Sequence, residues 1–379
     1  MVSGTVHWVG AGLSTGSGLA ELCDAADRVL LWHRTAERAE ESLERLGLAG
    51  KAEARAFTPA ALTAAFAPGD VVVSMLPATE HAGLLAACVA GGAHFVCSSY
   101  VSEAVLDQVP AATAAGLTVL TEAGLDPGID HLFAHALLGR ARTAIDPAEP
   151  AEVSLTSYCG GIPAVPNSFK YRFSWAPYGV LNALRAPARY IEDGTETVAD
   201  RPWEATRPHV LDGEPFEVYP NRDSVPYLTQ YAIPETWTPR TFIRGTLRLD
   251  GWLTAWQEVF ERLRTGDDAQ IRALAQELAR TYPTTETDHD RVVLSVALTV
   301  TSPAATWSGE YLLDMAGTPE ESAMARCVSR PLALGVRRVL AGALPPGLSR
   351  AAETPEASEE WLGELAAAGI EFGVRTSGG

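Results

Sequence analysis

The stretch Thr5-Val-His-Trp-Val-Gly10-Ala-Gly12 joins a short apolar run to a glycine-rich turn. A helical pattern follows from about Leu13 to Cys23. A strand, a tight glycine turn and a helix N-terminus in this order are typical of a site for the pyrophosphate of a dinucleotide. Thr15 stands where the pattern usually has its third glycine. A purely structural turn is the alternative. The sequence predicts dinucleotide contacts from Gly10, Ala11, Gly12, Leu13 and Ser14.

Strand and helix patterns continue to alternate after this turn. Helices are expected over Ala36–Leu46 and His81–Val89. Strands are expected at Arg28–Trp32, Val71–Met75, His94–Ser98 and Leu117–Leu120. Alternation of this kind predicts a parallel sheet with right-handed crossovers. The first part of the chain is therefore predicted to be an α/β domain of the Rossmann type.

The end of the second strand indicates which dinucleotide binds. The chain reads Trp32-His33-Arg34-Thr35 there, without the carboxylate that contacts the ribose 2′-hydroxyl of NAD. Arg34 can pair with a 2′-phosphate, and Thr35 can hydrogen-bond it. We therefore expect NADP(H) as the cofactor. The alternative is that Arg34 is only an exposed residue at the start of a helix.

Polar side chains follow the later strands, where ligands of open α/β sheets bind. We expect the segments after the strands at Val71 and His94 to converge with the loop Gly124–Pro127 at the nicotinamide end of the cofactor. Tyr100 and Asp126 become candidate acid/base groups by position, and a packed aromatic is the alternative for Tyr100. The residues expected there are Ser74, Met75, Leu76, Ser98, Ser99, Tyr100, Leu125 and Asp126.

Composition and charge exclude several classes of protein. The net charge of −18 argues against nucleic acid and anionic membranes as partners. No apolar run approaches the length of about 18 residues that a membrane helix needs, and no basic segment precedes the apolar start of the chain. We expect a cytoplasmic protein.

Cysteines and histidines give no sign of a metal site. The five cysteines are scattered without a CxxC pair, so we expect no disulfides and four core cysteines, with Cys159 as the exception. His131 and His135 have helical spacing, but no third ligand accompanies them, and we predict no metal.

Several segments, in order along the chain, carry a resemblance to a known family. The chain resembles the saccharopine reductases, the glutamate-forming saccharopine dehydrogenases. The matching segments are Ser98-Ser-Tyr-Val-Ser102, Glu122-x-Gly124-Leu-Asp-Pro-Gly-Ile-Asp-His131, Ser157-Tyr-Cys-Gly-Gly-x-Pro163, Tyr171-x-Phe-Ser-Trp175, Tyr219-Pro-Asn-Arg-Asp-Ser224, Arg244-Gly-Thr-Leu-Arg248, Glu321-Ser-Ala-Met-Ala325 and Ala368-Gly-Ile-Glu-Phe372.

The resemblance implies a domain organisation. It implies a second α/β domain with a mixed sheet that also forms a homodimer, a helical cap, and final helices that return to the first domain. The expected boundaries are 1–122 for the Rossmann domain, 123–250 and 291–320 for the substrate and dimerisation domain, 251–290 for the cap and 321–379 for the final helices. The cap is short here, because only Trp252–Arg264 and Asp268–Arg280 have helical patterns.

The resemblance also implies a reaction, in which 2-aminoadipate 6-semialdehyde and glutamate form an imine that NADPH reduces to saccharopine. The partners would thus be small-molecule substrates, an amino acid and an aldehyde or keto acid. Arg222 and Arg244 can each hold a carboxylate through two hydrogen bonds; surface ion pairs are the alternative. The implied catalytic residues are Asp126, Cys159 and Tyr100; the implied substrate residues are Ser99, Tyr100, Asp126, Arg222, Arg244, Gly245 and Thr246; and Ser174 is an implied cofactor contact.

Two other functions stay open at this stage. The short cap changes the mouth of the site, so the same reductive condensation could act on other substrates in a specialised pathway. A non-catalytic dinucleotide-binding protein is the second alternative. The combination of Tyr100, Asp126, Cys159, Arg222 and Arg244 argues against it, because a binding module has no need of the whole set.

Overall fold

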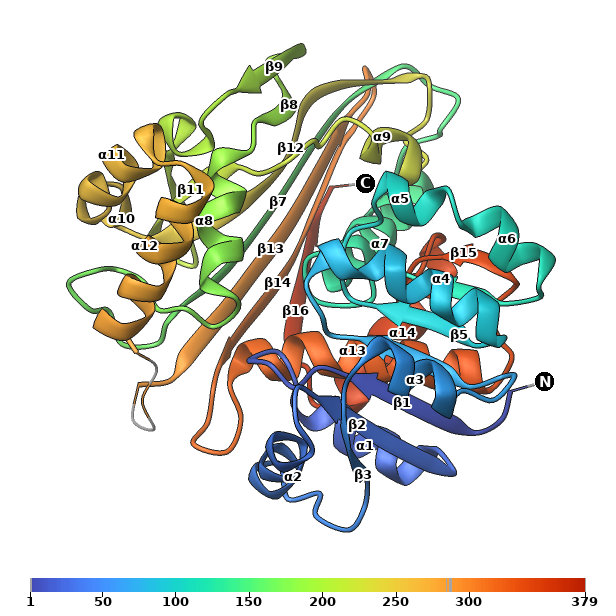
Figure 1. Cartoon of the computed structure of the whole chain (residues 1–379). Coiled ribbons are helices and arrows are strands. Elements are labelled where there is room, and N and C mark those ends of the chain that lie inside the picture. Colours follow the sequence, from blue (N-terminus) through green and yellow to red (C-terminus); the bar gives the residue numbers. More distant parts are fainter. Residues whose placement is uncertain (1, 284, 286–287, 379) are drawn as a thin grey trace. The chain divides into compact units, whose positions relative to one another are not determined.

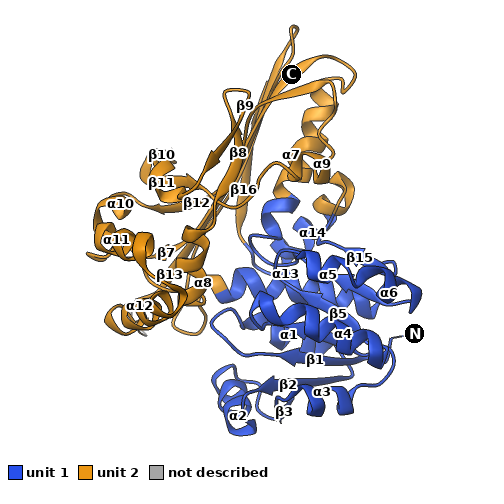
Figure 2. Cartoon of the chain, turned by 45° about the horizontal axis from the view of Figure 1, so that its top comes forward, with its two compact units in different colours: residues 1–132, 325–352, 360–370 blue, residues 133–324, 353–359, 371–379 orange. Residues whose placement is uncertain are grey.

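The computed structural model describes residues 2–283, 285 and 288–378. The chain divides into two compact units, each with its own sheet (Figure 2). The first unit comprises residues 1–132, 325–352 and 360–370, and the second comprises residues 133–324, 353–359 and 371–379.

The first unit contains a seven-stranded sheet, counted over the described residues, with the order β15-β6-β5-β4-β1-β2-β3 (Figure 1). All of its pairings are parallel. The strands are β1 (Thr5–Val9), β2 (Arg28–His33), β3 (Glu53–Ala56), β4 (Val71–Ser74), β5 (His94–Cys97), β6 (Thr118–Leu120) and β15 (Gly347–Ser349). The helices associated with this sheet are α1 (Ser17–Ala25), α2 (Ala36–Arg45), α3 (Pro59–Ala65), α4 (His81–Gly91), α5 (Glu103–Leu106), α6 (Val109–Ala114), α13 (Ala323–Leu340) and α14 (Pro355–Ala367).

This sheet confirms the predicted parallel α/β architecture. Its central strands read as continuous apolar runs because helices cover both faces, and Val71 to Val73 in β4 are fully buried. The helix predicted from Leu13 starts instead at Ser17. Gly16 has an extended backbone, so α1 cannot continue through it to the separate turn in which the Thr15 amide donates to the carbonyl of Gly12 at 3.0 Å.

Close packing of α1 depends on a glycine that follows the turn. A Cβ placed on Gly18 would lie 2.0 Å from the carbonyl oxygen of Ser329 in α13. The Gly18 amide donates to the Ser329 hydroxyl at 3.1 Å. Gly18 therefore permits a close approach of α1 to α13, and the Thr15 side chain, at the place of the third glycine, is buried beside the turn.

The second unit contains a mixed sheet with the order β10-β11-β12-β7-β13-β14-β16, and β8 and β9 attach to β12 as a hairpin. The pairing of β12 with β7 is parallel and the others are antiparallel, which confirms the expected mixed sheet. The strands are β7 (Ala151–Pro163), β8 (Ala188–Glu192), β9 (Thr195–Ala199), β10 (Arg207–Leu211), β11 (Glu214–Pro220), β12 (Trp237–Leu249), β13 (Asp290–Thr301), β14 (Thr306–Ala316) and β16 (Phe372–Ser377). The helices are α7 (Ile129–Ala144), which begins in the first unit, α8 (Pro177–Arg185), α9 (Tyr227–Gln230), α10 (Trp252–Ala255), α11 (Gln257–Thr265) and α12 (Asp268–Thr281).

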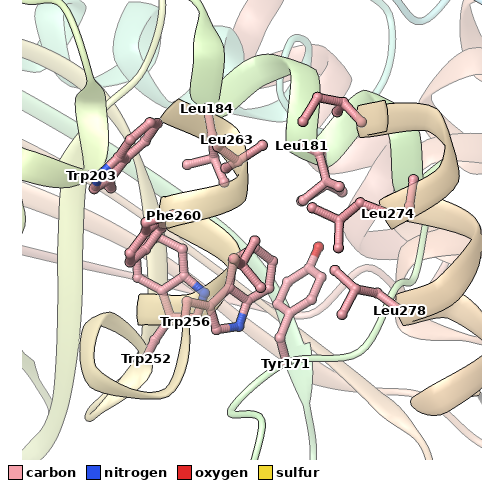
Figure 3. Packing of buried hydrophobic residues seen from close by; sticks show 14 of the residues in the cluster. Tyr171, Leu181, Leu184, Trp203, Trp252, Trp256, Phe260, Leu263, Leu274 and Leu278 are labelled. Atoms are coloured by element: carbon pink, nitrogen blue, oxygen red, sulfur yellow. The ribbon is translucent and has the colours of Figure 1, made fainter. Parts of the chain in front are cut away.

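Helices α8, α10, α11 and α12 surround an aromatic and aliphatic cluster beside β11 and β12. Tyr171, Trp252, Trp256 and Phe260 lie at its centre, and leucines of α8, α11 and α12 surround them (Figure 3). The single helix predicted over Trp252–Arg264 is wrong, because α10 ends at Ala255 and α11 begins after Trp256. The Trp256 indole is turned inward and donates to the carbonyl of Phe169 at 3.0 Å.

Among the described residues, no helix is long and apolar enough to cross a membrane. The five cysteines are all free, and Cys88, Cys97 and Cys327 are buried as expected for core residues. Cys23 is only partly buried, so that expectation was wrong for one of the four.

A buried histidine connects the first strands of the first unit. The His7 side chain is fully buried in β1, and its Nε2 lies 2.9 Å from Asp70 Oδ2. The Trp32 indole donates to His7 Nδ1 at 3.2 Å, so Nδ1 is the acceptor and Nε2 carries the proton. Burial lowers the pKa of His7, although Asp70 acts in the opposite direction. His7 is therefore held neutral.

We expect this histidine to make stability depend on pH. The folded-state pKa lies below the ordinary value of 6.5, so the unfolded chain binds the additional proton first as pH falls. The free energy of unfolding should therefore decrease below about pH 6.5, by at most about 1.4 kcal/mol per pH unit for each such group. Denaturant unfolding at several pH values measures this slope. His7→Gln should give a shallower slope; an unchanged slope would contradict the assignment.

Candidate active site

The glycine turn and the end of β4 form a cradle at the switch point of the first sheet. Gly10 has a φ of 102°, and a Cβ there would lie 3.2 Å from the Met75 backbone. A Cβ on Gly12 would meet nothing within 4 Å, so open space adjoins the turn. Ser74 is paired with Val9, and its buried hydroxyl has no hydrogen-bond partner among the described residues. Open space, backbone amides at a helix start and an unsatisfied hydroxyl fit a dinucleotide.

Arg34 and Thr35 lie directly beyond β2, as the sequence predicts. The Arg34 side chain is exposed, and its backbone amide donates to His33 Nδ1 at 2.8 Å. The Thr35 hydroxyl caps α2 by accepting from the amide of Arg38 at 3.3 Å. The Thr35 hydroxyl also hydrogen-bonds the Glu37 carboxylate, so it would have to give up that partner to donate to a phosphate. No carboxylate occupies the end of β2.

The structure brings Tyr100 and Asp126 together. The Tyr100 hydroxyl donates to Asp126 Oδ1 at 2.5 Å. The loop that carries Asp126 packs tightly on the end of β5, since a Cβ on Gly124 would lie 2.8 Å from the Ser98 Cβ. Gly128 has a φ of 147° and also leaves no room for a side chain, because its Cβ would lie 2.0 Å from the Gly124 carbonyl oxygen. The loop therefore requires its glycines.

Glu122 anchors the residues next to this pair, and the sequence analysis gave it no role. It is almost fully buried with a φ of 55°, in the left-handed region that glycine favours. Its Oε1 accepts from the amide of Val101 at 3.2 Å, and its Oε2 lies 3.2 Å from His131 Nε2 and 3.3 Å from Arg350 Nε. The only signal in the sequence was an acidic residue within the motif Glu122-x-Gly124, next to the loop of Asp126.

The pKa of Glu122 reflects these partners. Burial by itself would raise the pKa, but the hydrogen bond and charge of His131, the charge of Arg350 and the amide of Val101 lower it to about 2. The carboxylate is therefore ionised at any physiological pH. His131 also lies 3.5 Å from Asp130, which accepts the amide of Gly128 at 2.7 Å. The same group of charges thus holds the ends of the Asp126 loop.

In the second unit, one face of the mixed sheet collects the other predicted residues. Side chains alternate along a strand, so Arg244 and Thr246 of β12 share a face. Cys159 of β7 is paired with Thr246 and lies on that face as well. Gly161 follows two residues later, and a Cβ there would lie 2.6 Å from Ser174 Oγ. The Ser174 hydroxyl is buried without a hydrogen-bond partner among the described residues.

Arg244 is not the surface residue that the alternative assumed. Its side chain is buried, and its guanidinium lies 4.1 Å from the ring centroid of Tyr227. Its backbone amide donates to the Ser224 hydroxyl at 2.9 Å, and its carbonyl accepts from Asn221 at 2.9 Å. These bonds fix the loop that carries Arg222 to β12.

Arg222 differs from Arg244 in exposure, and Gly245 differs from it in the face of the sheet to which a side chain would point. Arg222 is exposed in that loop, with a φ of 58°, and its carbonyl accepts from the amide of Arg189 at 2.9 Å. A Cβ on Gly245 would meet the ring of Tyr158 at 2.8 Å, on the opposite face of the sheet. Only the backbone of Gly245 can therefore serve a ligand on the face of Thr246.

Neither His131 nor His135 lies within a cluster of potential metal ligands among the described residues. His131 contacts Glu122 and Asp130, and His135 packs edge-on against Tyr231 at 5.3 Å. In the described part of the chain, no group of three or more potential ligands could hold a metal ion.

The predicted site residues are divided between the two units. The glycine turn, Arg34, Ser74, Tyr100 and Asp126 belong to the first unit. The second unit contains Cys159, Ser174, Arg222, Arg244 and Thr246.

Family models match nearly the whole chain. The saccharopine dehydrogenase NADP binding domain matches residues 6–120, and the saccharopine dehydrogenase C-terminal domain matches residues 124–370.

Curated relatives carry related names. The saccharopine dehydrogenase (NADP+, L-glutamate-forming) of Pyricularia oryzae is 38% identical over 265 residues, which cover 66% of this chain and 56% of the relative. The enzyme of the same name from Saccharomyces cerevisiae is 41% identical over 198 residues, covering 51% of this chain and 43% of the relative. The chain thus spans about half the length of these relatives.

Solved structures agree with the sequence comparisons. The apo saccharopine dehydrogenase (L-Glu forming) of Saccharomyces cerevisiae matches with a TM-score of 0.82 and 26% identity, over 98% of this chain and 99% of that one. The homospermidine synthase of Legionella pneumophila has a TM-score of 0.66 at 12% identity over 98% of this chain and 91% of that one, which indicates a shared fold alone. On the strength of both domain models and these relatives, the chain belongs to the saccharopine dehydrogenase family.

Proposed function

We propose that this chain is an NADPH-dependent reductase of the imine formed between an amino acid and an aldehyde. The substrates that fit best are glutamate and 2-aminoadipate 6-semialdehyde, with saccharopine as the product, and the same site can run the reverse reaction. The observation that carries the proposal is the short hydrogen bond from Tyr100 to Asp126, which lies in the unit that holds the dinucleotide cradle. The names of the relatives from Pyricularia oryzae and Saccharomyces cerevisiae support these substrates.

NADPH supplies a hydride when it is bound. The residues suited to hold it are the glycine turn from Gly10, the hydroxyls of Ser74 and Ser174, and Arg34 with Thr35 for the 2′-phosphate. The chain's own contribution to the chemistry is to bind the two substrates, exclude water and manage protons.

Proton transfer falls to Asp126 and Tyr100. Imine formation requires an acid that expels water, and the imine nitrogen must be protonated before its carbon accepts hydride. Asp126 is fixed by a glycine-bounded loop, and the Tyr100 hydroxyl donates to it at 2.5 Å. Cys159 is more suitable as a neutral hydrogen-bonding partner than as a nucleophile, because imine reduction needs no covalent step on the protein.

Arg222 and Arg244 bind the carboxylates. The loop that carries Arg222 is hydrogen-bonded to the backbone of Arg244 through Asn221 and Ser224. Two arginines, one on this loop and one on the strand it is bonded to, suit the two carboxylates of glutamate. We also propose that the second unit binds substrate and forms a homodimer, with residues 251–290 as a cap. A role in lysine biosynthesis and a cytoplasmic location complete the proposal.

A screen of NADPH oxidation over pairs of amino acids and aldehydes tests the function directly. Glutamate with 2-aminoadipate 6-semialdehyde should give the highest rate, and mass spectrometry should detect saccharopine. A different preferred pair would favour the same chemistry on other substrates. No oxidation with any pair would favour the non-catalytic alternative.

Arg34→Ala should weaken NADPH binding while leaving NADH binding nearly unchanged. The lost contact is a charge-assisted hydrogen bond to the 2′-phosphate, worth about 1.5–3 kcal/mol. Dissociation constants measured by fluorescence titration give the two affinities. Arg45→Ala, at the other end of α2, is the matched control and should bind both cofactors like the wild type. Equal losses for NADPH and NADH in Arg34→Ala would refute the assignment.

Asp126→Asn should lower kcat about 100-fold or more, because the amide cannot deliver a proton in the rate-limiting step. The pH dependence of kcat should also change, and Tyr100→Phe should cost less than Asp126→Asn. Steady-state rates across pH measure both effects, with single-turnover kinetics to establish that chemistry limits the rate. If the variant keeps the wild-type profile and kcat, Asp126 only positions the substrate.

A further inference from the structure

Arg248 is a buried cation without an acidic partner. Its side chain is 5% exposed, and no acid among the described residues lies within 4.0 Å of its guanidinium. Glu217 of β11 stands directly opposite Arg248 in the sheet. The Glu217 carboxylate is used elsewhere, because it accepts the amides of Gly251 and Leu253 at 3.2 and 2.7 Å at the start of α10. Glu217, the acidic residue paired with Arg248 across the two strands, thus does not form an ion pair with it.

Aromatic rings surround the Arg248 guanidinium. Its central carbon lies 4.8 Å from the ring centroid of Tyr171, and 5.6 Å from those of Tyr219 and Trp252. Tyr171 and Trp252 are seen within the cluster in Figure 3. Arg248 Nη1 donates to the carbonyl of Leu247 at 3.0 Å, whereas the buried Nε has no hydrogen-bond partner in the described part of the chain. Ring faces attract a cation but do not cancel its charge.

A second cation borders the same cage. Lys170 has a φ of 56° and is held by a hydrogen bond from its amide to the carbonyl of Asn167 at 3.1 Å. A Cβ on Gly251 would lie 3.5 Å from Lys170 Cε and 3.9 Å from its Nζ, so the lysine extends to the residue before Trp252. Lys170 forms no ion pair with any described residue. Lys170 and Arg248 thus lie on either side of the start of α10, and neither forms an ion pair with a described residue; the buried charge of Arg248 costs stability unless an anion binds.

The cage lies on the face of the sheet that carries the candidate site. Arg248 is two residues beyond Thr246 and four beyond Arg244 on β12, so the three side chains share that face. Four strand residues put the Cα atoms of Arg244 and Arg248 about 13 Å apart. A ligand that reaches both arginines must carry carboxylates at the two ends of an extended chain. Free glutamate is too short for this.

We propose that Arg248 binds the carboxylate of the aldehyde substrate at the end remote from its reacting carbon. This inference rests on the proposed function. Arg222 and Arg244 match the two adjacent carboxylates of the amino-acid partner, and the joined product runs from there along β12, past Thr246, to Arg248. The enzyme then selects aldehydes that end in a carboxylate, and a plain alkyl aldehyde leaves a buried guanidinium unpaired.

Two ligands that differ by one carboxylate test the inference. We would measure the dissociation constants of saccharopine and of N-(aminopentyl)glutamate, which lacks only the remote carboxylate, by calorimetry on the full chain. The wild type should bind saccharopine at least about 10-fold more tightly. Arg248→Met should lose that preference by weakening saccharopine alone, and Arg248→Lys should lose most of it because a lysine lacks the planar fork. Arg240→Met, an exposed arginine on the same strand, should keep it.

Thermal unfolding separates this role from a structural one. Without ligand, Arg248→Met should unfold at the wild-type temperature or above it, because an unneutralised buried charge is removed. The inference is overturned if the wild type does not discriminate between the two ligands, or if Arg248→Met or Arg248→Lys weakens both ligands alike. The test of this inference can fail separately from the test of the proposed function. A preference for saccharopine without NADPH oxidation would reject the reductase activity and keep the carboxylate site. Equal rates of NADPH oxidation with and without a carboxylate on the aldehyde would keep the reductase activity and reject the carboxylate site.

Discussion

The buried carboxylate of Glu122 is the constraint on which the first half of the site depends. A charge that is 1% exposed is tolerated only when its surroundings neutralise it and satisfy its oxygens. Here the partners come from separate segments: the amide of Val101 after β5, His131 in α7 and Arg350 after β15. The hydrogen bonds and ion pairs of this one carboxylate therefore fix these segments relative to one another. The same contacts hold Glu122 in its left-handed backbone conformation. Tyr100, the neighbour of Val101, is positioned as a result.

In the second unit, the pleat of the sheet positions the side chains of the candidate site. Every second residue of β12 faces the same side, which places Arg244, Thr246 and Arg248 in one row. The two buried guanidinium groups lie against tyrosine rings, at 4.1 Å for Arg244 and 4.8 Å for Arg248. Aromatic contacts of this kind stabilise a cation while leaving its charge available to a ligand.

The sequence predicted those parts of the fold whose signals are local. The apolar strands β1, β2, β4, β5 and β6 are bounded by glycines and polar turns, and all five were expected. Strand β3 was missed because Glu53–Ala56 is polar and partly exposed, and β15 because Gly347-Leu-Ser349, unlike the apolar β6, has a single apolar residue. The break at Trp256 coincides with a tertiary hydrogen bond of its indole, and local helix preference gives no sign of such a contact.

The site shows the same division between local and tertiary information. The spacing of the glycines predicted where the cradle lies. The positions of Tyr100 and Asp126 after their strands predicted that the two side chains would lie close together. Burial was not readable, so Arg244 could not be told from a surface arginine. Glu122 and Arg248 were recognised only as members of the family motifs, and no role was predicted for either. Their importance comes from what surrounds them, and those partners lie far away in the sequence.

The edge strand β15 has a consequence for how the protein is made. It pairs with β6 across more than two hundred residues, and Ser329 completes the packing of α1. A ribosome synthesises the other strands of the first sheet early but supplies β15 only after every strand of the mixed sheet except β16 has been made. Until then the nascent chain has an open strand edge at β6 and an uncovered face on α1, which are surfaces that favour mispairing. The dinucleotide unit is therefore finished late, and its completion is coupled to synthesis of the domain inserted within it.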